Sequence, residues 1–339
     1  MVSLKYFKIA NPSKKEFEEI ENFVKLHPNA CYFQSTLFFK SCVSSSKLFP
    51  LYILAYDDNK LAGVLLVFKQ IQINKPVFSF LSSRNIIWGG PLVLNNNHII
   101  YEGLYGAYEK MKSPSIYTQV RNIYDMSDYK KSMNLIGFKY EEHLNIIVDL
   151  NKTAEQLWKE VHTKRRNEIR KALKELTTFF YVNNKEELTE CYTILMEVYS
   201  RANLPLPKKE HFEALLDNTN TDDGLKIFVA KFDNKIIGCM LCLVYGDTVF
   251  DYFAGALSKY YNKNPNDLIP WEVFKWGKQN GYKKFDFGGA GKPKIPYGVR
   301  EYKKKFGGEM VNYGRFEKVH FPFLFKLVSL GFNIVQKLN

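Results

Sequence analysis

The sequence predicts an α/β fold built from two similar domains in tandem. The chain has 339 residues, which is enough for two domains of ordinary size, and 46% of them are hydrophobic. Short apolar runs typical of strands alternate with segments of helical spacing in both halves. One stretch of the first half also recurs in the second half. We therefore expect two copies of a mixed, twisted sheet flanked by helices, joined near Asn151.

The recurring stretch has the pattern of a β-hairpin. Residues 52–63 align without a gap with residues 227–238, an offset of 175 residues, and apolar residues fall in matching places. Each copy carries Asp-Asn-Lys between two apolar runs, which is typical of a tight turn between strands. Chance similarity between two common hairpins is the alternative. Because helices precede each hairpin and a strand and a helix follow it, the sequence favours a duplicated domain.

The first domain is expected over residues 1–150. Apolar residues at helical spacing predict a helix over 14–26, and alternating runs predict the two strands of the hairpin. Further elements follow in the same way. The expected elements are helices over 14–26, 36–40 and 99–111 and strands over 51–56, 61–70, 77–81, 115–121 and 145–150.

The second domain is expected over residues 151–318 and begins with a strongly basic helix over 153–175. Thr153 and Gln156 form a capping-box pattern at its start, and its cations predict a solvated face from which one or two side chains reach phosphates. The later elements are helices over 192–199, 209–216 and 267–279 and strands over 248–254, 285–287 and 310–316. An apolar helix over 319–339 ends the chain, either packed on the protein or lying in a membrane surface.

The charge of the chain indicates anionic partners. The net charge is +13 and the pI is about 9.2, which suits nucleic acid, phosphorylated small molecules or an anionic membrane face. No apolar run reaches membrane-spanning length, and the first residues lack a signal-peptide core. Five cysteines without framework spacing suit reduced thiols. We therefore expect a cytoplasmic protein, with peripheral contact to the inner membrane face as the alternative for its tail.

A glycine turn followed by clustered cations is the most informative stretch for function. Asp286 lies on a short strand, Gly288 and Gly289 follow at once, and Arg300 and Lys303 belong to the basic segment beyond them. Glycines let the backbone turn sharply and approach a ligand closely. A strand end, a glycine turn and converging cations suit an anionic, phosphorylated ligand. A hairpin with a solvated basic face is the alternative.

Over nearly its whole length, the chain resembles the Fem family of aminoacyltransferases that build peptidoglycan interpeptide bridges, and their FemAB-like relatives. Those proteins are tandem domains of the GNAT acyltransferase superfamily. The resemblance rests on the order and spacing of short motifs. They are Phe33-Gln34-Ser35, Trp158 with Lys164-Arg165 and Ile169 to Ala172, Leu195-Met196 with Tyr199, Tyr252 to Gly255, and Phe285 to Gly289 with Gly298-Val299, Tyr302-Lys303 and Phe306 to Gly308.

The resemblance implies transfer of an acyl or aminoacyl group to an amine of a cell-envelope precursor, either an amino sugar or a peptidoglycan peptide. The precursor would be linked to a nucleotide or a lipid. The donor would be acyl-CoA, acyl-carrier protein or aminoacyl-tRNA, used as a co-substrate without a tightly bound cofactor. No sequence corresponds to the long helical arm of the tRNA-dependent relatives, because 175 runs almost directly into the strand-like stretch 177–182. A thioester of coenzyme A or of a carrier protein therefore stays open as the donor.

Lys303 and Asp286 are the candidate catalytic residues. By the resemblance, Lys303 falls on the lysine of the family's aromatic-Lys-x-x-Phe-Gly motif, where it would face the reacting carbonyl or a phosphate. Asp286 would assist proton removal, and capping of the glycine turn is its alternative role. The candidate substrate-binding residues are Lys40, Arg201, Tyr252, Gly288, Gly289 and Arg300. Core packing is the alternative for Tyr252, and a solvated surface position is the alternative for the cations.

No pattern of a covalent nucleophile or a metal site accompanies these residues. The six histidines show no metal-ligand spacing, and no Ser-His-Asp or Cys-His pattern is present. We therefore expect direct attack by the acceptor amine. The alternative function is a non-catalytic basic protein that binds tRNA or envelope lipid.

Overall fold

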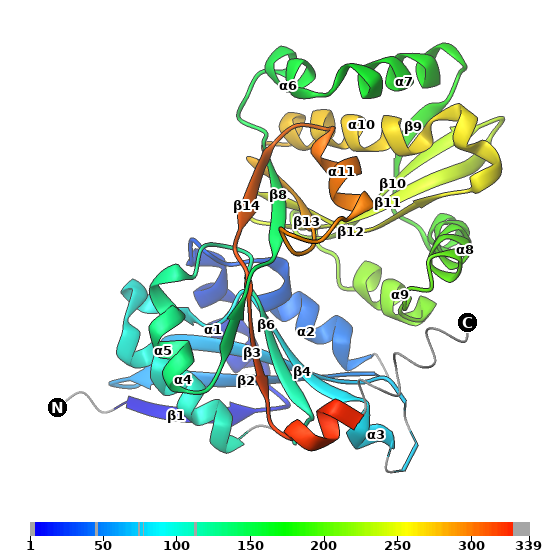
Figure 1. Ribbon diagram of the computed structural model, residues 1–339. Coiled ribbons are helices and arrows are strands. Elements are labelled where there is room, and N and C mark those ends of the chain that lie inside the picture. The colour runs from blue at the N-terminus through cyan, green and yellow to red at the C-terminus, as the bar shows by residue number, and fades with distance from the viewer. Residues whose placement is uncertain (1–3, 45–46, 74, 77, 112–113, 328–339) are drawn as a thin grey trace. The chain divides into compact units, whose positions relative to one another are not determined.

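The computed structural model describes residues 4–44, 47–73, 75–76, 78–111 and 114–327. The chain divides into two compact units (Figure 1). The first unit combines residues 1–142 with residues 313–339, and the second is the continuous segment 143–312. Each unit is a mixed sheet covered by helices, as the sequence predicts.

The first sheet has the order β1-β2-β3-β4-β6-β15-β7, with β5 paired to β3. All neighbours are antiparallel except β4 and β6, which run parallel. Its strands are β1 (Leu4–Ile9), β2 (Leu48–Asp57), β3 (Lys60–Ile71), β4 (Ser83–Trp88), β5 (Leu92–Val93), β6 (Tyr117–Arg121), β7 (Lys139–Glu141) and β15 (Arg315–Val319).

The helices of the first unit are α1 (Lys14–Leu26), α2 (Thr36–Val43), α3 (Phe78–Leu81), α4 (His98–Met111) and α5 (Lys130–Leu135). Ser13 and Glu16 cap α1 reciprocally. The apolar face of α4 packs on the sheet and contributes four tyrosine and leucine side chains to the core, Tyr101, Leu104, Tyr105 and Tyr108. The strand predicted over 77–81 is wrong, because the described residues 78–81 form a helical turn that starts after Pro76.

The second sheet has the order β14-β8-β13-β12-β11-β10-β9, again with one parallel pair, β12 and β13. Its strands are β8 (Leu144–Asp149), β9 (Thr178–Val182), β10 (Gly224–Phe232), β11 (Lys235–Tyr245), β12 (Thr248–Ala256), β13 (Lys284–Gly289) and β14 (Glu309–Asn312). Its helices are α6 (Ala154–Glu160), α7 (Thr163–Lys174), α8 (Lys185–Arg201), α9 (Lys209–Asp217), α10 (Pro265–Gln279) and α11 (Gly298–Lys304).

The predicted basic helix is present as two helices, α6 and α7. Thr153 and Gln156 form the expected capping box at the start of α6. The break falls at His162, whose side chain accepts a hydrogen bond from the Lys164 amide and whose own amide donates to the Lys305 carbonyl. This arrangement ties the start of α7 to the residue that follows α11.

The two hairpins have the same geometry, as expected for a duplicated domain. Asp58 and Asn59 both have positive φ, and so do Asp233 and Asn234, which is the geometry of a tight two-residue hairpin turn. Each hairpin has a register shift directly after its matching alanine, Ala55 or Ala230.

The glycine at the end of each recurring stretch has the same structural role in both units. A Cβ at Gly63 would lie 2.8 Å from Ile100 of α4, and a Cβ at Gly238 would lie 2.9 Å from Pro265 of α10. Glycine therefore allows the helix that follows the hairpin to pack closely on the sheet.

The boundaries of the two units differ from the expected ones at both ends. Residues 143–150, predicted to close the first domain, include β8, which pairs with β13 and β14 of the second sheet. The strand predicted over 310–316 is two strands, β14 and β15, which pair in different sheets. Gly314, with φ of +70°, lies between them. The second unit is thus inserted between β7 and β15 of the first.

The apolar tail is described only in part. Residue 319 ends β15, and residues 322–327 are helical. The rest of the helix predicted over 319–339 lies outside the described residues. Within the described part of the chain, no helix is both long and apolar enough to cross a membrane.

Candidate active site

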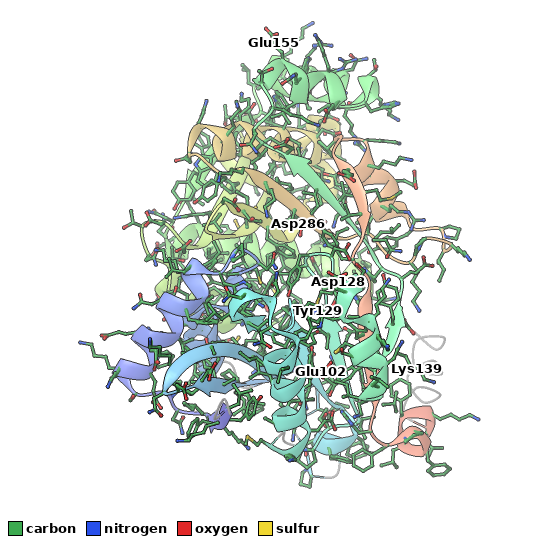
Figure 2. The ribbon with its side chains drawn as sticks, turned by 90° about the vertical axis from the view of Figure 1, so that its left-hand side faces the viewer. Glu102, Asp128, Tyr129, Lys139, Glu155 and Asp286 are labelled. Atoms are coloured by element: carbon green, nitrogen blue, oxygen red, sulfur yellow. The ribbon has the colours of Figure 1, made fainter. Side chains whose placement is uncertain are left out.

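The glycine turn at the end of β13 is built around the carboxylate of Asp286 (Figure 2). Asp286 is buried, and its Oδ1 accepts a hydrogen bond from the Gly288 amide at 2.6 Å. Asn145 of β8 donates its side-chain amide to the same carboxylate at 3.4 Å. Gly288 has φ of +68°, and a Cβ there would lie 3.1 Å from the Phe250 ring. Asp286 therefore caps the turn, as one of the two sequence interpretations predicts.

Lys303 reaches the same turn from α11. Its half-buried ammonium donates hydrogen bonds to the backbone carbonyls of Phe287 and Gly289, the latter at 3.2 Å. Gly289 itself is exposed. The structure thus places Lys303, Asp286, Gly288 and Gly289 together, with the cation held over the backbone of the turn.

A second carboxyl group, Asp251, completes this group and was missed by the sequence analysis. It lies on β12, where the pairing with β11 shifts between Leu241 and Cys242, so that Tyr252 is skipped. This β-bulge changes the direction of the side chains at this point of the strand. The Lys303 ammonium interacts electrostatically with the carboxyl group of Asp251 as well as with that of Asp286.

Burial makes both carboxyl groups weaker acids than usual. It raises the pKa of Asp251 to about 6, against the opposing effect of Lys303. Burial also raises the pKa of Asp286 to about 6, although the Gly288 amide, Lys303 and Asn145 all favour its charged form. Both groups therefore exchange protons close to neutral pH, which is the range that a general base needs.

The helix that carries Lys303 is fixed by a buried ion pair. Arg165 of α7 pairs with Asp267 of α10, and its guanidinium lies 4.9 Å from the ring centroid of Tyr302, the neighbour of Lys303. The Tyr302 hydroxyl donates to the Asn266 carbonyl. Through this ion pair and stacking contact, Arg165 of α7 connects to both α10 and α11.

Arg300 shapes the loop next to the site, and its expected role in substrate binding stays a prediction. The side chain is buried, and its guanidinium donates to the carbonyls of Ala290, Lys292 and Ile295. These hydrogen bonds fasten the loop between β13 and α11 to the first turn of α11.

Tyr252 lies on the bulge beside Asp251 and is half-buried. Its hydroxyl is 2.9 Å from Nε2 of His211 on α9. Burial lowers the pKa of His211 to about 4, so the ring is neutral at pH 7. The Tyr252 ring also contacts Phe212 and Phe253 edge-on or tilted, so packing and a polar contact coexist at this position.

Lys40 and Arg201 are exposed and lie on separate units, so no common site is described for them. Lys40 of α2 lies over the ring of Phe17, 4.8 Å from its centroid. Arg201, at the end of α8, pairs with Glu197 at 3.5 Å and donates to the Tyr261 hydroxyl. Their expected role in gripping a diphosphate stays a prediction.

Among the described residues, no cluster of histidine, cysteine or acidic side chains is arranged to hold a metal ion. The residues gathered at the turn instead combine an ammonium, two weakly acidic carboxyl groups and an exposed glycine backbone. This set can bind a developing negative charge and accept a proton.

Comparison with known proteins identifies the second unit. Residues 163–304 match the family described as "Acetyltransferase (GNAT) domain". This range contains Asp251, Asp286 and Lys303. No curated protein sequence matches the chain.

Solved structures share the fold of the whole chain. FemX has a TM-score of 0.73 at 16% identity, over 95% of this chain and 99% of that one. L-PGS from Bacillus licheniformis has a TM-score of 0.60 at 13% identity, over 97% of both chains. A tandem GNAT protein from the clavulanic acid biosynthesis pathway has a TM-score of 0.55 at 6% identity, over 93% of this chain and 98% of that one.

The domain match therefore indicates an acyltransferase domain of the GNAT type over residues 163–304, and the whole chain shares its fold with a tandem GNAT protein. Over nearly its whole length, the chain has a fold similar to that of FemX.

Proposed function

We propose that the protein transfers an acyl or aminoacyl group to a primary amine of a cell-envelope precursor, and that the turn at Asp286 is its active site. The observation that carries the proposal is the position of Lys303, whose ammonium is fixed at the exposed glycine turn beside two carboxyl groups with a pKa of about 6. The envelope precursor is proposed because FemX and L-PGS share the fold.

The proposed reaction is direct attack on an activated carbonyl. The amine nitrogen forms a bond to the carbonyl carbon, which gives a tetrahedral oxyanion. The C–S bond of a thioester or the C–O bond of an aminoacyl ester then breaks. The amine loses one proton, and the leaving thiolate or alkoxide gains one, so no oxidant or reductant is needed. The enzyme must stabilise the oxyanion and move that proton.

Different residues at the turn stabilise the oxyanion and move the proton. The Lys303 ammonium stabilises the oxyanion or a phosphate of the bound substrate. Asp286 accepts the proton, either directly or from a water molecule, and Asp251 holds the Lys303 ammonium in place by its charge. Exposed Gly289 lets the backbone of the turn approach the substrate closely.

The donor is proposed to be an acyl thioester, of coenzyme A or a carrier protein. The match to an acetyltransferase domain covers the residues of the site. In addition, α7 ends at Lys174 and β9 begins at Thr178, which leaves no room between them for a helical arm. Aminoacyl-tRNA is the competing donor.

Separate incubations with acyl-CoA, acyl-carrier protein and aminoacyl-tRNA test the proposal, with mass detection of products on amino-sugar and peptidoglycan precursors. Lys303→Ala is expected to lower the rate by about 100-fold or more, because a fixed charge at the oxyanion is lost. Lys304→Ala is the matched control, since Lys304 is the exposed neighbour on the same helix.

A Lys303→Ala enzyme as active as the Lys304→Ala enzyme would remove Lys303 from the mechanism. Product formation only with aminoacyl-tRNA would leave the site standing but overturn the thioester donor. Binding of every substrate without turnover would overturn the proposed reaction as a whole.

A further inference from the structure

Four segments of the first unit meet at one end of its sheet. Ile71 donates its amide to the Lys47 carbonyl, and the Ile116 amide donates to Ser83. The amide of His320 returns to the Ile116 carbonyl at 2.9 Å. In Figure 1, α3 and the red helix over 322–327 lie next to each other at this end. We call this region the aromatic end; it comprises the described residues of 43–50, 69–84, 114–117 and 320–327.

Aromatic and aliphatic side chains are exposed at the aromatic end. Phe323 is 75% exposed and Phe78 is 55% exposed. The other exposed apolar residues of this end are Val43, Phe49, Ile73, Phe321 and Leu327. Ring contacts join the segments, with Phe80 and Phe321 at 5.2 Å and Tyr117 and Phe325 at 5.3 Å between centroids. Such a group of exposed apolar side chains on one end is typical of an interaction surface.

The same region is positively charged. The four segments of the aromatic end contain five Lys or Arg and no Asp or Glu. Lys318 pairs with Glu109, which lies just outside these segments. Lys75 and Lys326 are exposed. Apolar side chains among lysines, without acidic residues, suit an anionic lipid surface.

A small cavity opens beside this surface. It has a volume of about 170 Å³, and Lys8, Lys69 and Asn85 contribute its polar lining. Partial burial lowers the pKa of Lys69. Among the described residues, neither lysine has a carboxylate partner, whereas many other lysines of the chain do. Two ammonium groups without counterions, at a cavity of this size, suit one phosphate group.

We propose that the aromatic end docks the protein on an anionic phospholipid bilayer, with its exposed apolar side chains in the interface and one lipid phosphate between Lys8 and Lys69. This contact surface lies on the first unit and is independent of the proposed reaction in the second. It would hold the enzyme at the membrane where lipid-linked substrates lie.

Co-sedimentation of the full chain with phosphatidylcholine vesicles, with and without phosphatidylglycerol, tests the proposal. We expect binding only when phosphatidylglycerol is present, and weaker binding at high salt because the attraction between exposed charges is screened. Phe78→Ser/Phe323→Ser and Lys8→Gln/Lys69→Gln are each expected to weaken binding by about tenfold or more.

Matched controls are available in the same unit. Leu26→Ser/Leu135→Ser removes two apolar side chains elsewhere in the first unit that are even more exposed than Phe78 and Phe323, and Lys60→Gln/Lys139→Gln removes the same charge. Both controls are expected to bind vesicles like the unchanged protein. Thermal unfolding of each variant checks that it is folded.

Three results would overturn the proposal. They are absence of vesicle binding by the unchanged protein, equal binding to neutral vesicles, and equal loss of binding in the control pairs. Acyl transfer to a water-soluble acceptor should be the same in all these variants. A loss of transfer without a loss of vesicle binding would therefore concern the active site and not the docking surface.

Discussion

At the scale of single residues, Asp286 combines a structural and a chemical role. Its carboxylate caps the glycine turn through the Gly288 amide, and it interacts electrostatically with Lys303 and Asp251. Its pKa is raised because burial outweighs three interactions that favour the charge. A buried carboxyl group whose pKa is shifted in this way is a candidate catalytic residue, because catalytic acids and bases need such shifted pKa values.

The pH dependence of turnover is the first prediction at this scale. Because the carboxyl groups have a pKa of about 6, the basic form of Asp286 is lost below that pH. We expect kcat to fall about tenfold per pH unit below about pH 6 and to level off above it. Measurement of kcat with saturating substrates, for the unchanged enzyme and for Asp286→Asn and Asp251→Asn, checks this. If the kcat of Asp286→Asn still falls below about pH 6, a group other than Asp286 accepts the proton.

The stability of the Asp286→Asn variant is the second prediction. A carboxyl group with a folded-state pKa above its unfolded value contributes stability below the unfolded pKa, and this is lost as the pH rises through about 6. Asparagine can still accept the Gly288 amide but carries no charge. We expect the variant to be about 1 to 2 kcal/mol more stable than the unchanged protein at pH 7.

Denaturant unfolding at pH 7 and at pH 4 measures this difference. The gain should shrink at pH 4, where the native carboxyl group is protonated as well. A variant that is less stable than the unchanged protein at pH 7 would contradict the raised pKa.

The order of the short motifs led to Lys303 and the glycine turn, and the structure places the Lys303 ammonium on that turn. Their roles in the reaction stay predictions. Asp251 was missed because it lies in an aromatic strand that reads as core, although Phe250-Asp251-Tyr252 repeats the pattern of Phe285-Asp286-Phe287. Arg300 could not be separated from the other cations, because its three carbonyl partners are set by the fold of the loop.

At the scale of elements, the position of α11 depends on α7 and α10. Arg165 supplies both the ion pair with Asp267 and the stacking contact with Tyr302. The basic helix was expected to be a solvated face with one or two phosphate contacts. The structure shows that one of its cations is instead largely buried, and burial keeps the pKa of Asp267 raised despite this partner.

Replacement of Arg165 is the prediction at this scale. Arg165→Met leaves the Asp267 carboxylate buried without its cation, and we expect a loss of about 2 to 4 kcal/mol in the free energy of unfolding. Turnover should fall as well, since Tyr302 and Lys303 share a helix. Denaturant unfolding and kcat measure the two effects.

The double variant Arg165→Met/Asp267→Leu provides the control, because it removes both charges. It should recover most of the stability. If the double variant is as unstable as the sum of the single variants, the ion pair does not couple the two helices.

At the scale of the whole molecule, the second unit is an insertion into the first. Strand β15 pairs with β6 and β7, so the first sheet is complete only with a strand that follows the second unit in the chain. The hairpins and most helices could be predicted from local patterns. The choice of sheet for β8 and β15 could not, because backbone pairing over long distances leaves little trace in the sequence of a short strand.

Fragments test this division. Residues 143–312 contain all strands of the second sheet, and we expect this fragment to fold cooperatively. Residues 151–318 lack β8, which lies between β13 and β14, and this fragment should not fold because β14 then has no partner and the edge of β13 is left unpaired. Circular dichroism and denaturant unfolding distinguish the two. Equal stability of both fragments would show that β8 is dispensable and would overturn the division.

The insertion also has a consequence during synthesis on the ribosome. Multidomain chains generally fold from the N-terminus as they emerge. Here every strand of the second unit is translated before β15, so the later-encoded unit can reach its native structure first. The earlier-encoded unit stays incomplete until β15 is translated, because one edge of β6 has no partner strand. Any chaperone that assists this protein would bind the first unit in this incomplete form.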